Sequence, residues 1–267
     1  KWRTCLSDNA RKNVRANVAT SEKAVKPFEN SDIQFAFQPI VDTYRARVSS
    51  IEALIRSNDG RYPETILEEL VGPEKYDFDL KSKAIAIKQG AALLSSDQSL
   101  SINLCPRAIT STVNVADYLH ELVKRNKLKP QQLVIEVTET EIISESDTFY
   151  QAIEQIRSRG MRVAIDDFGA GYAGLSLLAD FTPDKIKLDR KITTGIHESG
   201  HRQAITEAVL EFANSMGIPL VVEGVETIDE WLWLQHAGVQ RFQGFLFAKP
   251  KLNGVSGIDF SFDGASS

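Results

Sequence analysis

Along the chain, short runs of apolar residues alternate with longer stretches in which apolar residues recur at helical spacing. The short runs predict strands at residues 34–41, 48–55, 100–104, 133–137, 162–165, 185–188, 219–222 and 239–242. The helical spacing predicts helices at 78–94, 115–123, 149–156, 204–216 and 228–234. Strands and helices that alternate in this way are typical of α/β proteins built on a parallel sheet.

The number of strands and the chain length together favour one architecture. About eight strands in 267 residues favour a modified (β/α)8 barrel of the TIM type over an open, doubly wound sheet. The first two strands are separated by residues 42–47 alone, and this connection is too short for a helical crossover. We therefore expect an α/β barrel with one antiparallel strand.

The two ends of the chain differ from the middle. Residues 1–30 mix basic, polar and alanine residues without a strong apolar period, and we interpret them as an N-terminal linker. The alternative is a helix that couples the domain to an upstream sensor. The folded domain is expected at residues 31–256, followed by a polar tail at 257–267.

Composition excludes several classes of protein. The chain is 42% hydrophobic and 25% charged, has no signal-peptide pattern, and lacks an apolar run long enough to span a membrane. Its 31 basic and 36 acidic residues give a net charge of −5, which argues against a polymeric nucleic acid as partner. Cys5 and Cys105 make no disulfide framework, which favours a reducing, cytoplasmic location.

Polar residues interrupt or end the predicted strands, and most of them are acidic. In a barrel, the carboxyl ends of different strands converge on one mouth. A carboxylate cluster there needs cations, and oxygen ligands without Cys or His favour Mg²⁺ or Mn²⁺ over Zn²⁺. Each acid alone also fits a surface charge or a helix N-cap. The polar residues are Glu52, Asn103, Glu136, Asp166, Asp167, Lys187, Asp189 and Glu223.

A glycine motif offers a competing interpretation. Gly169, Gly171 and Gly174 match G-x-G-x-x-G after a predicted strand, and Asp189 lies 20 residues beyond Gly169, as in a dinucleotide-binding fingerprint. That fingerprint normally opens the first βα unit, whereas several strands precede it here. Glycines that permit a tight turn after Asp166 and Asp167 explain the motif better.

Seven separated segments resemble, in order and spacing, the motifs of EAL-domain cyclic-di-GMP phosphodiesterases. The resemblance covers residues 34–250, and the segments are IEALIR, SINL, VIEVTE, DDFGAGYAGLS, DKIKLDR, VVEGVET and FQGFLFAKP. It implies a modified (β/α)8 barrel with one antiparallel strand and hydrolysis of cyclic-di-GMP to linear 5′-pGpG by a two-metal mechanism.

The resemblance also implies a role for each matching residue. The ligands of two Mg²⁺ or Mn²⁺ ions would be Glu52, Asn103, Glu136, Asp166, Asp167 and Glu223. Glu52, Asp167, Glu223 and Lys187 would be catalytic, with Lys187 orienting the attacking water and stabilising phosphate charge as an ammonium. Substrate would be bound by Gln38, Arg56 and Gln243, with supporting roles for Glu139, Asp189 and Glu226.

Further properties implied by the resemblance concern partners and ions. The family usually dimerises near the loop that holds Glu139, so a homodimer is expected, and an upstream sensor domain is expected outside this chain. Ca²⁺ is expected to inhibit, because it prefers more ligands and longer distances than Mg²⁺. The chain departs from the family pattern at Ala170, where threonine is usual, and over residues 57–78.

The sequence is also compatible with two other functions, a cyclic-di-GMP receptor and a different metal-dependent barrel enzyme. Many domains of this family bind cyclic-di-GMP without cleaving it, although here no expected ligand is missing. An enolase-type barrel enzyme would need histidine or lysine bases at the mouth. The four histidines, His120, His197, His201 and His236, fall in predicted helices or loops and are expected at the surface.

Overall fold

The fold was analysed in a computed structural model of the chain, which describes residues 33–58, 72–112, 114–138, 147–171, 178–179 and 181–260. Its strands are β1 (Ile33–Asp42), β2 (Arg47–Ser57), β3 (Ser99–Asn103), β4 (Leu133–Thr138), β5 (Arg162–Phe168), β6 (Lys185–Leu188), β7 (Leu220–Glu223), β8 (Arg241–Gln243) and β9 (Lys251–Leu252).

The strands close into a barrel. Strands β2 to β8 follow one another in parallel around the sheet, and β1 closes it by pairing antiparallel with both β2 and β8. The short β9 adds to the outside of β1, also antiparallel. The predicted α/β barrel with one antiparallel strand is therefore confirmed, and the extra strand β9 is a feature that the apolar pattern does not predict.

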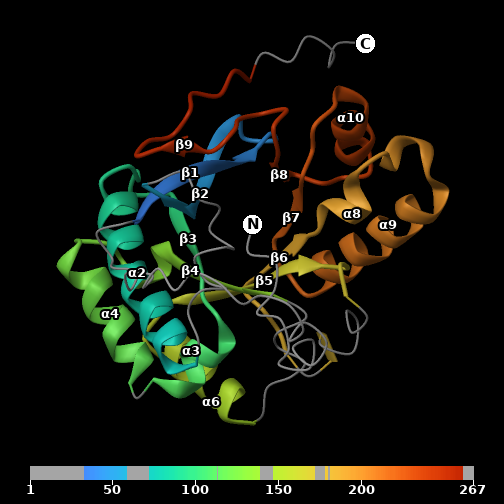
Figure 1. The fold of residues 1–267 in the computed structure, drawn as a ribbon. Coiled ribbons are helices and arrows are strands. Elements are labelled where there is room, and N and C mark those ends of the chain that lie inside the picture. Colours follow the sequence, from blue (N-terminus) through green and yellow to red (C-terminus); the bar gives the residue numbers. More distant parts are fainter. Residues whose placement is uncertain are drawn as a thin grey trace, which may run out of the picture.

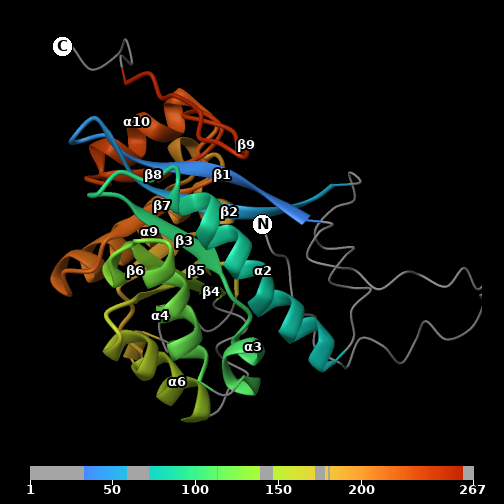
Figure 2. The same cartoon turned by 90° about the vertical axis from the view of Figure 1, so that its left-hand side faces the viewer.

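Helices surround the barrel on its outer side (Figure 1, Figure 2). On one side lie α2, α3, α4 and α6, and on the other lie α8, α9 and α10. Their bounds are α2 (Pro73–Ala91), α3 (Pro106–Ser111), α4 (Val115–Arg125), α6 (Asp147–Ser158), α8 (Arg190–Thr193), α9 (Gly200–Ser215) and α10 (Ile228–His236), with 3-10 turns at η3 (Pro130–Gln132) and η4 (Ile196–Glu198). None of the helices among the described residues is long and apolar enough to cross a membrane.

Two layers of side chains follow from the alternation of each strand. On β6, Ile186 and Leu188 face outward and pack into the apolar core shared with the helices. Lys185 and Lys187 point the other way, into the barrel. Because the remaining strands alternate in the same manner, the apolar cluster lies between barrel and helices. The barrel interior holds the polar side chains together with a few apolar ones, such as Val134 and Val221.

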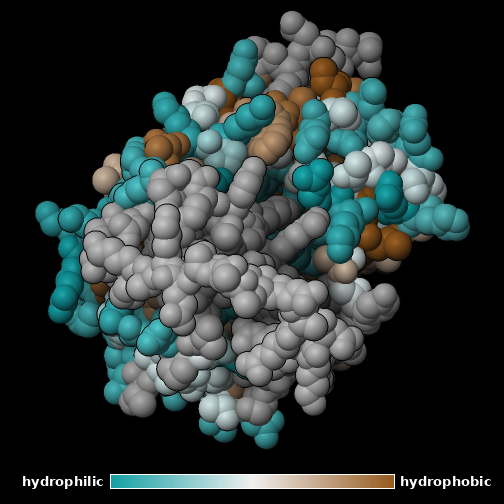
Figure 3. Space-filling model, viewed as in Figure 1, coloured by the Kyte–Doolittle hydropathy of each residue, from teal (hydrophilic) through white to brown (hydrophobic). Residues whose placement is uncertain are grey.

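The order of elements follows the apolar pattern closely, but some boundaries differ. The helix expected at 78–94 begins five residues earlier, at Pro73, because proline is well suited to the first turn. Ile258 and Phe260 also pack against the core, beyond residue 256. The described face in Figure 3 is mainly hydrophilic, and its apolar residues occur as small separate patches.

The closed barrel argues against a dinucleotide-binding role for the glycine motif and favours a tight turn. A dinucleotide fingerprint belongs to an open doubly wound sheet, and this sheet is closed. Gly169 has a φ of 88° and follows β5 in a turn, while Gly174 lies outside the described residues. Asp189 caps α8 by accepting a hydrogen bond from Lys191 N at 2.9 Å.

Candidate active site

A fully buried lysine lies at the centre of a ring of carboxylates inside the barrel. Lys187 Nζ is 2.6 Å from Glu136 Oε2 and 2.8 Å from Glu223 Oε1. It is also 3.1 Å from Asp166 Oδ1 and 3.3 Å from Glu52 Oε2. One cation therefore faces four carboxylates, each from a different strand, and the cluster is a site of concentrated negative charge.

Strand register brings these side chains to the same level. Gln38 of β1 stands opposite Glu52 of β2, and Asn103 of β3 stands beside Glu136 of β4. At the other side of the barrel, Glu223 of β7 pairs with Gln243 of β8. Because each of these residues lies near the carboxyl end of a parallel strand or opposite one, the inward-facing set collects at one mouth.

Asp166 and Asp167 reach the same cluster in spite of being neighbours. Consecutive residues of a regular strand point to opposite faces. The register of β5 against β6 shifts between Ile165 and Phe168, and Asp167 has a φ of 52°, a left-handed conformation that aspartate tolerates better than most residues. The irregular backbone turns the Asp167 carboxylate toward Asp166 and Glu223.

Amide side chains hold the carboxylate of Glu52 in place. Asn103 Nδ2 donates to Glu52 Oε1 at 2.9 Å, and Gln243 Nε2 donates to Glu52 Oε2 at 2.6 Å. Gln243 Nε2 also lies 3.3 Å from Gln38 Oε1, and Gln38 Nε2 donates to the carbonyl of Ala248 at 3.0 Å. The hydrogen bonds fix the orientation of Glu52 at the mouth.

Burial and charge shift the pKa values of the cluster in different directions. Burial would raise the pKa of Glu52, but the Lys187 ammonium and the two amide donors hold it below its usual value. Burial raises the pKa of Glu136, and burial with the neighbouring Glu223 charge raises that of Asp166 well above its usual value. Burial alone would lower the pKa of Lys187, but the four carboxylates raise it well above its usual range.

The donor set fits divalent metal ions. Two groups of carboxylates have oxygen atoms within 4.8 Å of one another, namely Glu52, Glu136 and Asp166, and Asp166, Asp167 and Glu223. Asp166 belongs to both groups. Glu136 Oε1 is buried and has no hydrogen-bond partner among the described residues, so a ligand oxygen remains available. An all-oxygen set of this kind suits Mg²⁺ or Mn²⁺.

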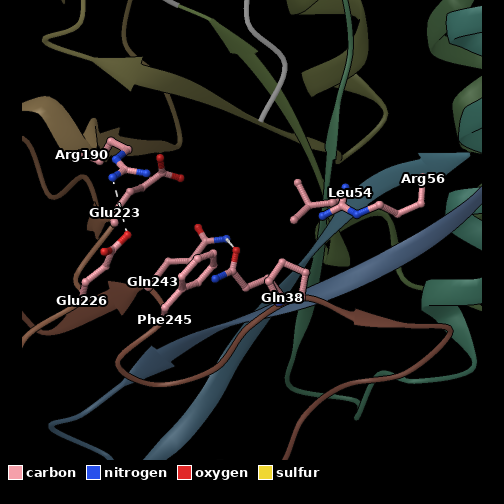
Figure 4. A pocket seen from close by; sticks show the side chains of 11 residues that line it. Gln38, Leu54, Arg56, Arg190, Glu223, Glu226, Gln243 and Phe245 are labelled. Atoms are coloured by element: carbon pink, nitrogen blue, oxygen red, sulfur yellow. Dashed lines mark hydrogen bonds and ion pairs between the residues drawn. The ribbon is translucent and has the colours of Figure 1, made fainter. Parts of the chain in front are cut away.

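A pocket of about 340 Å³ opens beside the cluster (Figure 4). Gln38 and Gln243 meet in its middle, Leu54 and Arg56 line one side, and the carboxylates of Glu223 and Glu226 lie on the other with Arg190. Phe245 is 52% exposed, and Lys249 Nζ lies 5.4 Å from its ring centroid. Polar groups, two guanidinium groups and an exposed ring thus border the acidic cluster.

Not every expected site residue lies in the cluster. Glu226 lines the pocket and pairs with Arg190 at 3.5 Å, and the Arg56 guanidinium donates to the carbonyl of Ile55. Asp189 lies at the cap of α8, and Glu139 lies outside the described residues.

Sequence reasoning missed two groups around the pocket, Arg190 and Phe245. Arg190 directly follows the Lys187–Asp189 segment, and this adjacency is the signal that could have found it. Phe245 lies two residues beyond Gln243 and could have been found in the same way. The four histidines lie in helices or 3-10 turns, at His120, His197, His201 and His236, so the barrel mouth described here has no histidine base.

A family model identifies the fold and the motifs together. The model for the EAL domain matches residues 21–250. The chain belongs to the EAL domain family. The matched span contains every residue of the carboxylate cluster, so the expected resemblance is confirmed.

Relatives of this EAL domain include enzymes and a regulator. The blue light- and temperature-regulated antirepressor BluF of Escherichia coli K12 is 42% identical over 224 residues, which are 84% of this chain and 56% of BluF. The cyclic di-GMP phosphodiesterase RocR of Pseudomonas aeruginosa is 29% identical over 242 residues, which are 88% of this chain and 62% of RocR.

Among solved structures, Klebsiella pneumoniae BlrP1 in complex with manganese and cyclic di-GMP is similar to this EAL domain. It is 44% identical, with a TM-score of 0.82, over 87% of this chain and 59% of the BlrP1 chain. BlrP1 has also been solved with calcium and cyclic di-GMP. The chain spans less than two thirds of the length of each of these three proteins.

Proposed function

We propose that this EAL domain is a metal-dependent phosphodiesterase that hydrolyses cyclic-di-GMP to linear 5′-pGpG. The observation that carries the proposal is the buried cluster in which Asp166 belongs to two groups of three carboxylates. The name of RocR and the BlrP1 complex with manganese and cyclic di-GMP support the substrate and the metal.

The proposed ligands divide between two ions. Glu52, Asn103, Glu136 and Asp166 would hold the first, and Asp166 and Asp167 the second, with Glu223 anchoring a water beside it. When bound, two divalent ions lower the pKa of a water, neutralise the phosphodiester and stabilise the leaving oxygen. The water oxygen forms the new bond to phosphorus, the bond to the 3′-oxygen breaks, and this oxygen takes up a proton.

Lys187 acts as a cation in this mechanism, not as a base. Burial would lower its pKa, but in the metal-free domain the carboxylates that face it raise the pKa and favour the ammonium, which has no lone pair with which to remove a proton. An ammonium at this position donates hydrogen bonds to the attacking water or to a phosphate oxygen, where negative charge develops. Its task is therefore orientation and charge stabilisation.

The pocket beside the cluster is proposed to bind the nucleotide. Arg56 and Arg190 offer guanidinium groups suited to a phosphate, and Gln38 and Gln243 offer amides at its centre. The exposed ring of Phe245 offers a face on which a base can stack.

Partners and location are proposed on the same basis. An upstream sensor domain is proposed because BluF, a light- and temperature-regulated protein, is nearly twice as long as the part that matches. A homodimer is proposed from the family resemblance, with the Glu139 loop at the contact, and light scattering of the purified chain tests it. A cytoplasmic location remains a proposal that rests on cysteine usage.

A second function is favoured by one observation. BluF is named an antirepressor, a name that indicates action on a repressor. This EAL domain would then bind cyclic-di-GMP and change a protein contact. The complete set of proposed ligands in this chain favours hydrolysis over that function.

Chromatography of the purified chain with cyclic-di-GMP tests the proposal. Linear pGpG is expected with Mn²⁺ or Mg²⁺ and is expected to disappear with a chelator. Ca²⁺ in place of Mg²⁺ is expected to inhibit, because it prefers more ligands at longer distances. Tight binding of cyclic-di-GMP without any product would instead support the second function.

A further inference from the structure

The opposite end of the barrel carries a second pocket, of about 280 Å³, that is basic instead of acidic. Five of its lining residues are cationic and one is acidic, although the chain as a whole has a net charge of −5. The cations come from the starts of four strands and from the turn before β4, and they are Arg47, Lys129, Arg162, Lys185 and Arg241.

Lys185 is the group at this pocket that most needs a partner. Its side chain points into the barrel from the start of β6, and the residue is only 9% exposed. No hydrogen bond or ion pair of its ammonium is found among the residues that the structure describes. A largely buried ammonium without a hydrogen-bonded counter-ion is costly, because the charge of Glu136 offsets only part of the lost hydration.

The charges of the other cations in this pocket are only partly neutralised, and one of these cations also has an unused hydrogen-bond donor. Arg47 Nη1 pairs with Asp97 Oδ2 at 2.6 Å, but its Nε is buried and makes no hydrogen bond in the described part of the chain. Arg241 Nη2 lies 4.0 Å from Asp42 Oδ2, at the limit of an ion pair. Charges that act on Lys185 come from Glu136 and Lys187 above it and from Arg162 and Arg241 around it. After these pairings the pocket keeps a positive excess.

We propose that this basic pocket is an anion-binding site that takes a phosphate group, with Lys185 as its central ligand. A tetrahedral oxyanion offers several acceptors, which suits an ammonium at the floor and forked guanidinium groups at the wall. The phosphate can belong to free inorganic phosphate or to a nucleotide. The site is independent of the proposed phosphodiesterase function, since it uses none of the metal ligands.

Calorimetric titration of the full chain with inorganic phosphate tests the proposal, in a chelating buffer at constant ionic strength. Saturable binding is expected in the parent chain. Lys185→Gln is expected to weaken it by about tenfold or more, because a charge-assisted hydrogen bond is lost. Lys124→Gln removes the same charge from an exposed ion pair on α4 and is expected to leave binding unchanged.

Further variants and ligands test whether the phosphate binds in this pocket and whether it belongs to a nucleotide. Arg162→Gln changes an exposed residue, so it keeps the test open if Lys185→Gln does not fold, and weaker phosphate binding is again expected. Titration with 5′-GMP against guanosine shows whether a nucleotide phosphate is preferred, and Asp167→Asn is expected to leave phosphate binding intact. Absence of saturable phosphate binding, or unchanged binding in both pocket variants, would overturn the proposal.

Discussion

Lys185 and Lys187 stand two residues apart on the same face of β6, both buried in the barrel, in opposite electrostatic surroundings. Lys187 meets four carboxylates within 3.3 Å. Burial lowers the pKa of Lys185 to about 8, with only partial compensation by the Glu136 charge. One strand therefore supports an acidic mouth at one end of the barrel and a basic pocket at the other.

The lowered pKa of Lys185 predicts a pH-dependent stability. In the unfolded chain the lysine titrates near its ordinary value of 10.5, and in the folded chain near 8. The cost of the buried charge is thus fully present below pH 8 and is relieved as the pH rises from 8 to 10.5. Lys185→Met is expected to raise the free energy of unfolding at pH 7 by on the order of 3 kcal/mol in anion-free buffer.

Chemical denaturation of both chains at several pH values measures this difference. The advantage of Lys185→Met is expected to shrink toward pH 10.5, and added phosphate is expected to reduce it at pH 7. An equal difference at pH 7 and pH 10.5 would contradict a buried, only partly compensated ammonium at this position.

Removal of the central cation is expected to destabilise the metal-free protein. Lys187→Met leaves four buried carboxylates without their shared partner, and loss of one member of a buried ion pair costs about 3–5 kcal/mol. Divalent cations should recover much of this stability while hydrolysis stays absent. Thermal unfolding with chelator and with Mg²⁺ measures both parts, and a variant as stable as the parent without metal would contradict the role of Lys187 as counter-ion.

Asp167 offers a test of the proposed second metal ion. Asp167→Ala is expected to lower turnover of cyclic-di-GMP by about two to three orders of magnitude, because a Lewis acid contributes several kcal/mol. Alanine also fits poorly at a φ of 52°. Asp167→Asn is therefore the matched control, since asparagine tolerates that conformation and removes only the charge. Because an asparagine Oδ1 can still ligate a metal ion, full turnover in both Asp167→Ala and Asp167→Asn is the result that would exclude a ligand role for this carboxylate.

Close packing of two loops at the pocket predicts that Gly244 does not tolerate a side chain. A Cβ atom at Gly244 would lie 2.0 Å from the carbonyl oxygen of Val225, so the β7–α10 loop would have to move. Gly244→Ala is expected to cost more than about 2 kcal/mol and to weaken nucleotide binding. Gly257→Ala, where a Cβ meets no atom within 4 Å, is the control and is expected to be neutral.

Much of the site could be predicted because strand ends converge in a barrel. The apolar pattern around Glu52, Glu136 and Glu223 places each acid inside a strand, and the barrel topology then brings them to one mouth. The same logic fails for Asp167. Strict alternation would turn it away from Asp166, and only the shifted register and left-handed backbone bring it back.

The basic pocket could not be predicted from local pattern for a related reason. Arg47, Arg162, Lys185 and Arg241 lie far from one another in the sequence, at the starts of four different strands. They form a group only because the closed sheet places the starts of their strands together. Their shared charge is therefore visible only in the folded barrel.

The antiparallel closure by β1 has a consequence for the order in which the chain assembles. Val41 pairs with Phe242, and the hydrogen bond from Gln243 to Glu52 spans 191 residues. As the chain emerges from the ribosome, the strand that carries Glu52 is made early and must wait for β8 before its carboxylate is fully held. Synthesis must therefore run almost to the end of the domain before the acidic centre is complete, so fragments that lack β8 retain the acids but not the arrangement that holds them.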